Sequence, residues 1–318
     1  MRAIVLPRHG GPDVLELQEL DRPTPADHEL LVRVVASGTN PVEAKMRQNA
    51  AWAGLTPPFV LGYDVSGVVE AVGASVRDFA VGDEVYYTPE IFGNPRGSYA
   101  EYNAVAASIV ARKPARMSHE EAAAVPLAGG TAWEGLVRRL QVRPGETVLI
   151  HGGAGGVGSY AVQIARAMGA RVLATAGARN QQVLRDLSAD VAIDYAGEDV
   201  AEVARRETGG AGVDVVFDTA GGDNIQKSIP ATRPFGRLAT ILTPAGPLGG
   251  LSSKNQTLHG IFLMREGERL REMARLIDQG KLRSLVDRVL PLAEVRQAHE
   301  RLDSGHGTGK VVLRVTEG

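Results

Sequence analysis

A glycine-rich turn between two apolar runs constrains the fold of this chain more than any other feature. The turn reads Gly-Ala-Gly-Gly-Val-Gly over residues 153–158, shortly after the apolar run 147–150. A helical pattern covers 157–168, and a second apolar run covers 171–175. This order of strand, glycine turn, helix and strand predicts a parallel βαβ unit whose helix N-terminus binds a pyrophosphate.

The glycines of the turn have separate roles in this prediction. We expect Gly153 to allow the sharp turn, Gly155 to let the backbone approach the pyrophosphate, and Gly158 to let the helix pack closely on the strand. The alternative is a bare glycine-rich turn, but the flanking strands and helix favour dinucleotide binding. The loop residues expected to contact the dinucleotide are Gly153, Ala154, Gly155, Gly156, Val157 and Gly158.

The end of the second apolar run indicates which dinucleotide is bound. An acidic side chain there would bind the ribose hydroxyls of NAD, but this chain has Gly177 and then Arg179. The lack of a carboxylate removes repulsion against a 2′-phosphate, and a guanidinium can bind that phosphate in a bidentate manner. The sequence therefore predicts NADPH as cofactor. The alternative for Arg179 is an ordinary surface charge.

The rest of the chain falls into three stretches. Short strand patterns separated by Gly and Pro, such as 65–72 and 84–87, fill the first stretch and predict a β-rich region. Helix and strand patterns alternate after Ser118, which forms a capping box with Glu121 and predicts a helix start there. The last stretch contains an amphipathic helical pattern, expected over 266–279, and a final strand.

The composition limits the possible functions. The formal net charge of the 318 residues is -2, so no basic field favours nucleic acid or an anionic membrane surface. No apolar run approaches the roughly 20 residues that a bilayer-spanning helix needs, and no secretion signal is apparent, so we expect a soluble cytoplasmic protein. The chain has no Cys, and its 7 His show no paired metal-ligand spacing, so we expect no metal site.

Several segments together resemble the zinc-independent branch of the medium-chain dehydrogenase/reductase superfamily that contains quinone oxidoreductases, among them zeta-crystallin, and enone reductases. Besides the glycine turn, they are GTNPVEAKMR (38–47), LGYDVSGVV (61–69), VGDEVY (81–86), GSYAEY (97–102), AAAVPLAGGTAW (122–133), FDTAGG (217–222) and GKVVL (309–313). The resemblance covers essentially the whole chain.

The resemblance implies an α/β protein with two domains. A GroES-like, β-rich catalytic domain is expected from residues 1–118 and 259–318. A Rossmann domain with a doubly wound parallel sheet is expected from 119–258, and the active site is expected in the cleft between the two domains. The implied reaction is zinc-independent, NADPH-dependent hydride transfer to a quinone or an α,β-unsaturated carbonyl compound.

Three residues match the catalytic positions of the family. Asn40 is expected to donate to the substrate oxygen or to orient the cofactor. Lys45 is expected to stabilise negative charge on that oxygen, with an exposed helix cation as the alternative. Tyr63 replaces a His ligand of zinc-dependent relatives and is expected to line the pocket. The neighbouring Asp64 is expected to be structural, bonded to an Arg or to the backbone.

The resemblance also implies contacts to the cofactor outside the loop. Thr131 is expected near the nicotinamide carboxamide and Tyr195 near the 2′-phosphate. Gln181 stands where a Lys usually assists that phosphate, which weakens the NADPH prediction. The further cofactor positions are Thr219, Thr243 and Phe262, the last of which is equally well explained by packing.

The resemblance leaves a second class of function open. A small-molecule substrate and a homodimer are the implied partners. The alternative is a cofactor-binding protein with little turnover, used as a structural or binding module. The intact glycine turn and the lack of a basic stripe favour the enzyme.

Overall fold

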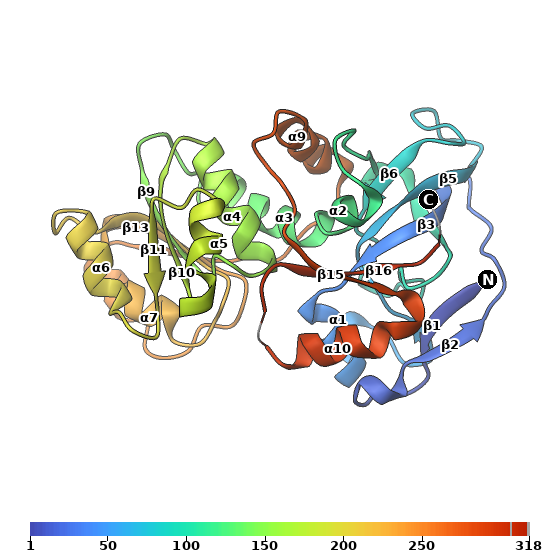
Figure 1. Ribbon diagram of the computed structural model, residues 1–318, viewed down its shortest axis with the longest axis horizontal. Helices are drawn as coiled ribbons and strands as arrows, with labels where there is room; N and C mark the ends of the chain where they lie inside the picture. Colours follow the sequence, from blue (N-terminus) through green and yellow to red (C-terminus); the bar gives the residue numbers. More distant parts are fainter. Residues whose placement is uncertain (306, 317–318) are drawn as a thin grey trace. The chain divides into compact units, whose positions relative to one another are not determined.

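The computed structural model describes residues 1–305 and 307–316. The chain forms two compact units: a first unit of residues 1–128 and 264–318 and a second unit of residues 129–263 (Figure 1). The expected domain boundaries, after 118 and 258, lie earlier in the chain. The first one differs because helix α2 (His119–Ala123), which begins at the expected Ser118 capping box, contacts strands β3 and β5 of the first unit.

The first unit consists mainly of strands. In the described part of the chain they form a three-stranded sheet, β2-β1-β4, and a seven-stranded sheet in the order β15-β16-β3-β5-β6-β8, with β7 paired to β3. The strands are β1 (Arg2–Leu6), β2 (Glu16–Glu19), β3 (Glu29–Gly38), β4 (Phe59–Val60), β5 (Val65–Val72), β6 (Glu84–Tyr87), β7 (Tyr102–Ala106), β8 (Ala111–Arg112), β15 (Val286–Pro291) and β16 (Lys310–Arg314).

Strand β3 organises this unit and leads to the candidate site. Its residues are almost all buried, as expected for an apolar run covered on both faces. It pairs antiparallel with β16, with Val312 opposite Gly38, so the end of the chain lies beside the residues that follow β3. Gly38 has to be glycine, because a Cβ there would stand 2.3 Å from the carbonyl oxygen of Ala123.

The helices of the first unit hold this arrangement in place. They are α1 (Pro41–Gln48), α2, α9 (Gly267–Asp278) and α10 (Val295–Asp303), and α3 (Pro126–Trp133) leads into the second unit. Helix α1 lies beside α10 (Figure 1), and Arg47 of α1 pairs with Asp303 of α10 at 2.6 Å. Gly280, with φ +72°, follows the end of α9, close to the expected helix end.

The second unit is a parallel α/β structure, as the sequence predicts. Its six strands run in the order β11-β10-β9-β12-β13-β14, and every neighbouring pair is parallel. The strands are β9 (Thr147–His151), β10 (Arg171–Ala176), β11 (Val191–Asp194), β12 (Val213–Asp218), β13 (Thr232–Thr240) and β14 (Thr257–Gly260). The order reverses between β9 and β12, the point at which such sheets bind their ligands.

The helices of the second unit connect these strands. They are α4 (Gly156–Ala167), α5 (Gln181–Asp186), α6 (Val200–Glu207), α7 (Asn224–Ser228) and α8 (Gly250–Ser253), and a π-helical segment covers Glu134–Arg139. The buried side chains Leu149, Leu173, Val216 and Leu238 of four neighbouring strands belong to one apolar core. Among the described residues, no helix has both the length and the apolar character needed to cross a bilayer.

Candidate functional site

The glycine loop turns from β9 into α4 through Gly152 and Gly153. Gly152, with φ +74°, adopts the left-handed conformation that favours glycine, whereas Gly153 does not. A Cβ on Gly153 would instead stand 2.8 Å from Leu184 Cδ2 and 2.9 Å from Ala174 Cβ. Gly153 therefore lies in the turn, but close packing and not a left-handed backbone conformation requires glycine there.

The start of α4 lies very close to the loop that precedes it. A Cβ on Gly158 would stand 2.0 Å from the carbonyl oxygen of Gly152, so only glycine allows this approach. The N-cap of α4 is Gly155, which supplies no side-chain cap. The first-turn N–H groups, from Gly156 to Gly158, have no acceptor within the helix, and the positive end of the helix dipole lies with them. This geometry suits a pyrophosphate.

Two threonines that flank the loop hold its shape. Thr175 on β10 accepts hydrogen bonds from the N–H of Gly152 through Oγ1, at 3.1 Å, and from the N–H of Gly153 through its carbonyl, at 2.8 Å. Thr219 donates its hydroxyl to the carbonyl of His151 at 2.6 Å. Thr219 was an expected cofactor residue, whereas the role of Thr175 was missed, because no local pattern marks a contact between adjacent strands.

The residues expected at the 2′-phosphate lie around the end of β10. The hydroxyl of Tyr195 is 3.7 Å from the position of a Cβ on Gly177, and 60% of Tyr195 is exposed. Arg179 is exposed and has no hydrogen bond or ion pair to any described residue. The Gln181 amide donates to the carbonyl of Ala176 at 2.8 Å, so it holds the strand end.

The other expected cofactor residues differ in exposure. Thr131 on α3 is 7% exposed, whereas Thr243 and Phe262 are exposed, Phe262 at 49%. His151, at the end of β9, is a buried strand residue and lies 2.7 Å from the Ser228 hydroxyl. Burial lowers the pKa of His151 to about 4, so its imidazole is neutral near neutral pH.

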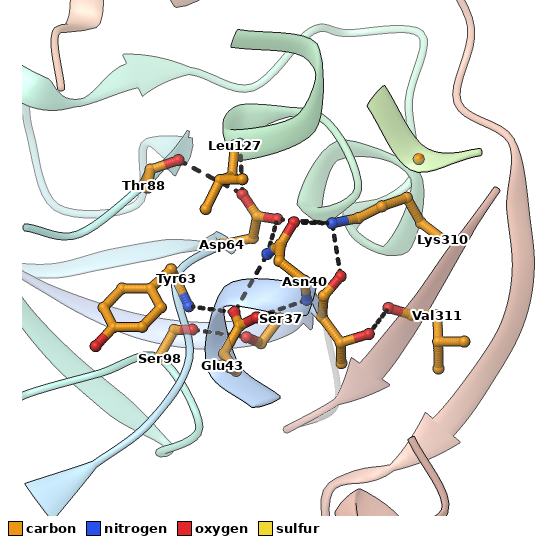
Figure 2. A network of polar contacts seen from close by, with 12 residues as sticks. Ser37, Asn40, Glu43, Tyr63, Asp64, Thr88, Ser98, Leu127, Lys310 and Val311 are labelled. Carbon is orange, nitrogen blue, oxygen red and sulfur yellow. Dashed lines mark hydrogen bonds and ion pairs between the residues drawn. The ribbon is translucent and has the colours of Figure 1, made fainter. Parts of the chain in front are cut away.

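The first unit contains a buried polar network around Asn40, the N-cap of α1 (Figure 2). The Asn40 amide nitrogen donates to Asp64 Oδ2 at 2.9 Å and to Glu43 Oε1 at 3.2 Å. The Asn40 amide oxygen accepts from the ammonium of Lys310. Asn40 is only 2% exposed. All its polar atoms therefore have partners inside the protein.

The two acids of the network are held by several donors. Glu43 accepts from the backbone N–H of Asn40 at 2.6 Å and from that of Tyr63 at 3.1 Å. Asp64 accepts from the backbone N–H of Leu127 at 2.7 Å. Burial raises the pKa of Glu43 to about 8 and also raises the pKa of Asp64, while the nearby Lys310 opposes both shifts.

Lys310 is the residue of this network that sequence reasoning missed. Asp64 was expected to bond an Arg or the backbone, but its side-chain cation is Lys310, with Nζ 3.2 Å from Oδ2. The two residues are 246 positions apart, and only the pairing of β16 with β3 brings them together. The sequence offers one indication of this role: Lys310 is the first residue of an apolar strand expected to be buried. A Lys at such a position is rarely left without a partner of opposite charge.

Tyr63 and Lys45 lie in opposite environments. Tyr63 is fully buried, and its hydroxyl has no hydrogen-bond partner among the residues that the structure describes. Burial, together with nearby Glu43, raises the pKa of Tyr63, so its hydroxyl stays protonated. Lys45 is exposed on α1 and has no ion pair with any described residue. Glu43 links Asn40 to the backbone of Tyr63, but the side chain of Lys45 is not part of this network.

A catalytic zinc ion does not fit the residues at these positions. Within residues 1–305 and 307–316, no three His, Cys, Asp or Glu side chains could hold a metal ion. The whole chain has no Cys, so no thiolate ligand is available.

Known proteins with similar sequences establish the family. Residues 26–115 match the alcohol dehydrogenase GroES-like domain, and residues 187–313 match the zinc-binding dehydrogenase family. The chain is 36% identical to the chloroplastic NADPH-dependent alkenal/one oxidoreductase of Arabidopsis thaliana, covering 98% of this chain and 79% of that protein. This chain belongs to the medium-chain dehydrogenase/reductase superfamily.

Other members of the superfamily are similar over nearly the whole chain. Human quinone oxidoreductase is 31% identical, over 98% of this chain and 97% of its own. An alcohol dehydrogenase superfamily protein from Novosphingobium aromaticivorans has a TM-score of 0.94 at 39% identity, covering 99% of this chain and 100% of its own. A mycobacterial protein in complex with NADPH has a TM-score of 0.88 at 33% identity, over 99% and 100% of the two chains.

Proposed function

We propose that this protein is an NADPH-dependent reductase that transfers hydride to quinones or to α,β-unsaturated carbonyl compounds without a metal ion. The observation that carries the proposal is the 36% identity, over nearly the whole chain, to an NADPH-dependent alkenal/one oxidoreductase. The quinone oxidoreductases among the relatives support the same reaction class. The structure of the glycine loop and the buried network around Asn40 agree with such an enzyme.

The second unit binds the cofactor. The loop from Gly153 to Gly158 and the start of α4 hold the pyrophosphate, and Arg179 binds the 2′-phosphate beside Gly177 and Tyr195. Thr131, Thr219, Thr243 and Phe262 line the rest of the cofactor site. When bound, NADPH supplies the hydride that reduces the substrate.

The first unit stabilises the charge that develops on the substrate. The exposed ammonium of Lys45 attracts the negative charge that forms on the carbonyl or quinone oxygen. The Tyr63 hydroxyl is protonated and lacks a partner, so it is a donor for a substrate oxygen that reaches it. Both hydrogens of the Asn40 amide are engaged internally, so Asn40 acts by holding the site in shape.

The homodimer that the resemblance implies, and the cytoplasmic location expected from the sequence, complete the proposal. Light scattering during size-exclusion chromatography tests the first, with a mass of two chains as the expected result. Fractionation of cells that express the protein tests the second, with the protein expected in the cytosolic fraction.

Turnover with purified protein tests the reaction. The protein is incubated with NADPH and a panel of enones, alkenals and quinones, and the loss of NADPH absorbance is followed. We expect oxidation that depends on the substrate, together with a saturated carbonyl product from the enones. NADPH binding without oxidation above background would contradict the proposal and support the cofactor-binding protein with little turnover.

A further inference from the structure

The side-chain ammonium of Lys310 is buried and contacts only protein atoms. Nζ donates to the carbonyl of Thr39 at 2.7 Å and to the Asn40 amide oxygen, and it lies 3.2 Å from Asp64 Oδ2. The residue is only 4% exposed. Its three hydrogens therefore match three acceptors, and no water is required.

The same contacts fix the orientation of the Asn40 amide. Its oxygen faces the one ammonium of the network, and its two hydrogens face the carboxylates of Asp64 and Glu43 (Figure 2). A flipped amide would turn its oxygen toward the two carboxyl groups and its N–H groups toward the ammonium. Lys310 therefore makes one orientation of Asn40 far more favourable than the other.

Lys310 is also the cation that offsets two buried acids. Asp64 and Glu43 are both fully buried, and the positive charge of Lys310 acts on each of them. Without Lys310, the two carboxyl groups would share the Asn40 amide with no compensating charge. A buried charge left unpaired in this way is strongly unfavourable.

The network ties together the backbone segments on which the proposed site stands. Glu43 accepts from the N–H of Tyr63, and Asp64 accepts from the N–H of Leu127 at the start of α3. Asn40 caps α1, the helix that carries Lys45. Loss of this network would therefore disturb both the start of α1, which carries Lys45, and the backbone of Tyr63.

We propose that Lys310 is a positioning residue for the reductase site. By holding the Asn40 amide and the Asp64 carboxylate, it fixes the start of α1 and the segment 61–64 relative to each other. The contacts of Lys310 with Asn40 and Asp64 thereby determine the positions of Lys45 and Tyr63. The inference rests on the proposed reductase function, and it assigns Lys310 no contact with the substrate.

Substitution of Lys310 tests this inference. We expect Lys310→Met to lower kcat by about tenfold or more, with the Kd for NADPH changed by less than about twofold, because the cofactor residues lie in the second unit. Lys310→Arg keeps the charge and is expected to recover a large part of kcat. Lys281→Met, at an exposed lysine on the same unit, is the matched control and should leave kcat unchanged.

Amide hydrogen exchange gives a readout that is independent of turnover. In Lys310→Met, the N–H groups of Tyr63 and Leu127 are expected to exchange faster, whereas that of Gly153, bonded to Thr175, stays protected. The inference would be contradicted if Lys310→Met folds and changes neither kcat nor the amide exchange of Tyr63 and Leu127. Lys310 would then be only an ion-pair partner in the core.

The inference can still be tested if the wild-type protein is inactive or if Lys310→Met does not fold. If the wild-type protein reduces no quinone or enone, the proposed function fails, and the exchange experiment still decides whether Lys310 positions the segment. If Lys310→Met does not fold, the charge-neutral pair Lys310→Met with Asp64→Asn replaces it. A drop in kcat of about tenfold is expected for that pair as well, and an unchanged kcat would overturn the inference.

Discussion

The hydroxyl of Tyr195 lies 3.7 Å from the point at which a side chain on Gly177 would begin. The two residues come from neighbouring parallel stretches of the second unit, since Ala176 pairs with Asp194 just before them. The exposed Arg179 follows two positions after Gly177. An exposed guanidinium close in sequence to a residue without a side chain suits a 2′-phosphate.

Arg179→Ala is expected to weaken NADPH binding by about tenfold or more and to change NADH binding by less than about twofold. The reason is that only NADPH carries the phosphate that a guanidinium can bind. Isothermal titration of both dinucleotides measures the difference, with Arg185→Ala on the exposed side of α5 as control. If the affinity for both cofactors fell equally, Arg179 would not be part of the phosphate site.

Gly177→Asp is expected to reverse the cofactor preference toward NADH. Gly177 has φ -70° and ψ 163°, which any residue can adopt, and its Cβ would meet only the Tyr195 hydroxyl at ordinary contact distance. The variant should therefore fold, while its carboxylate repels the 2′-phosphate and binds the ribose hydroxyls of NADH. The ratio of kcat/KM for the two cofactors is the measurement. An unchanged ratio would show that the phosphate lies elsewhere.

Gly158→Ala is expected to abolish NADPH binding or to destabilise the protein, because the added methyl would stand 2.0 Å from the carbonyl oxygen of Gly152. The backbone would have to move at the point where the pyrophosphate is held. Gly249→Ala is the control, because a Cβ there meets nothing within 4 Å. Fluorescence titration with NADPH and thermal unfolding of both variants test the prediction, which fails if the two behave alike.

Lys45→Met is expected to lower kcat for enones by about tenfold, with little change in the Kd for NADPH. The exposed ammonium acts on the charge that develops on the substrate, whereas the cofactor is held by the second unit. Steady-state kinetics with one enone and one quinone measure the effect. If kcat is unchanged, Lys45 is an ordinary surface cation of α1.

His151 and His299 are expected to remain neutral in the folded protein at about pH 5. Burial lowers the pKa of His151 to about 4, and burial with the nearby Arg47 lowers that of His299 to about 3, from 6.5. The imidazole nitrogen shifts in NMR spectra measure this directly, with free histidine in the same buffer as reference. A resonance of either residue that titrates near the reference would contradict the prediction.

The depressed pKa values of these two histidines also predict that they lower the free energy of unfolding as the pH falls. Their pKa values are depressed in the folded state, so the unfolded chain binds more protons below pH 6.5. Their contribution to the free energy of unfolding is present above that pH and is lost as the pH falls toward 4 and 3. Each contributes a slope of up to about 1.4 kcal/mol per pH unit in this window.

Local patterns were enough to predict many of the elements. Strands β5 and β6 coincide with the ranges expected from the sequence, and α2 begins at the Ser118–Glu121 capping box. These features depend on residues that are neighbours in the chain: alternating apolar side chains for strands, and a side chain three positions away for a cap. The parallel sheet of the second unit follows from the alternation of such elements.

Contacts between distant segments could not be predicted in the same way. The sequence marks a glycine turn but does not show that Gly152, and not Gly153, takes the left-handed conformation, because packing against Leu184 and Ala174 decides the place of Gly153. The hydrogen bonds that the loop N–H groups of Gly152 and Gly153 donate to Thr175 likewise depend on the register of two strands.

The sequence by itself therefore determined the fold class, the dinucleotide loop and the superfamily, because each of these depends on short motifs and their order. Only the tertiary structure decided how the first unit holds its site. Asn40 is available in the sequence as a possible donor to substrate, but folding places it between two carboxylates and the ammonium of Lys310. The Asn40 amide is therefore engaged within the protein, as most buried polar groups are.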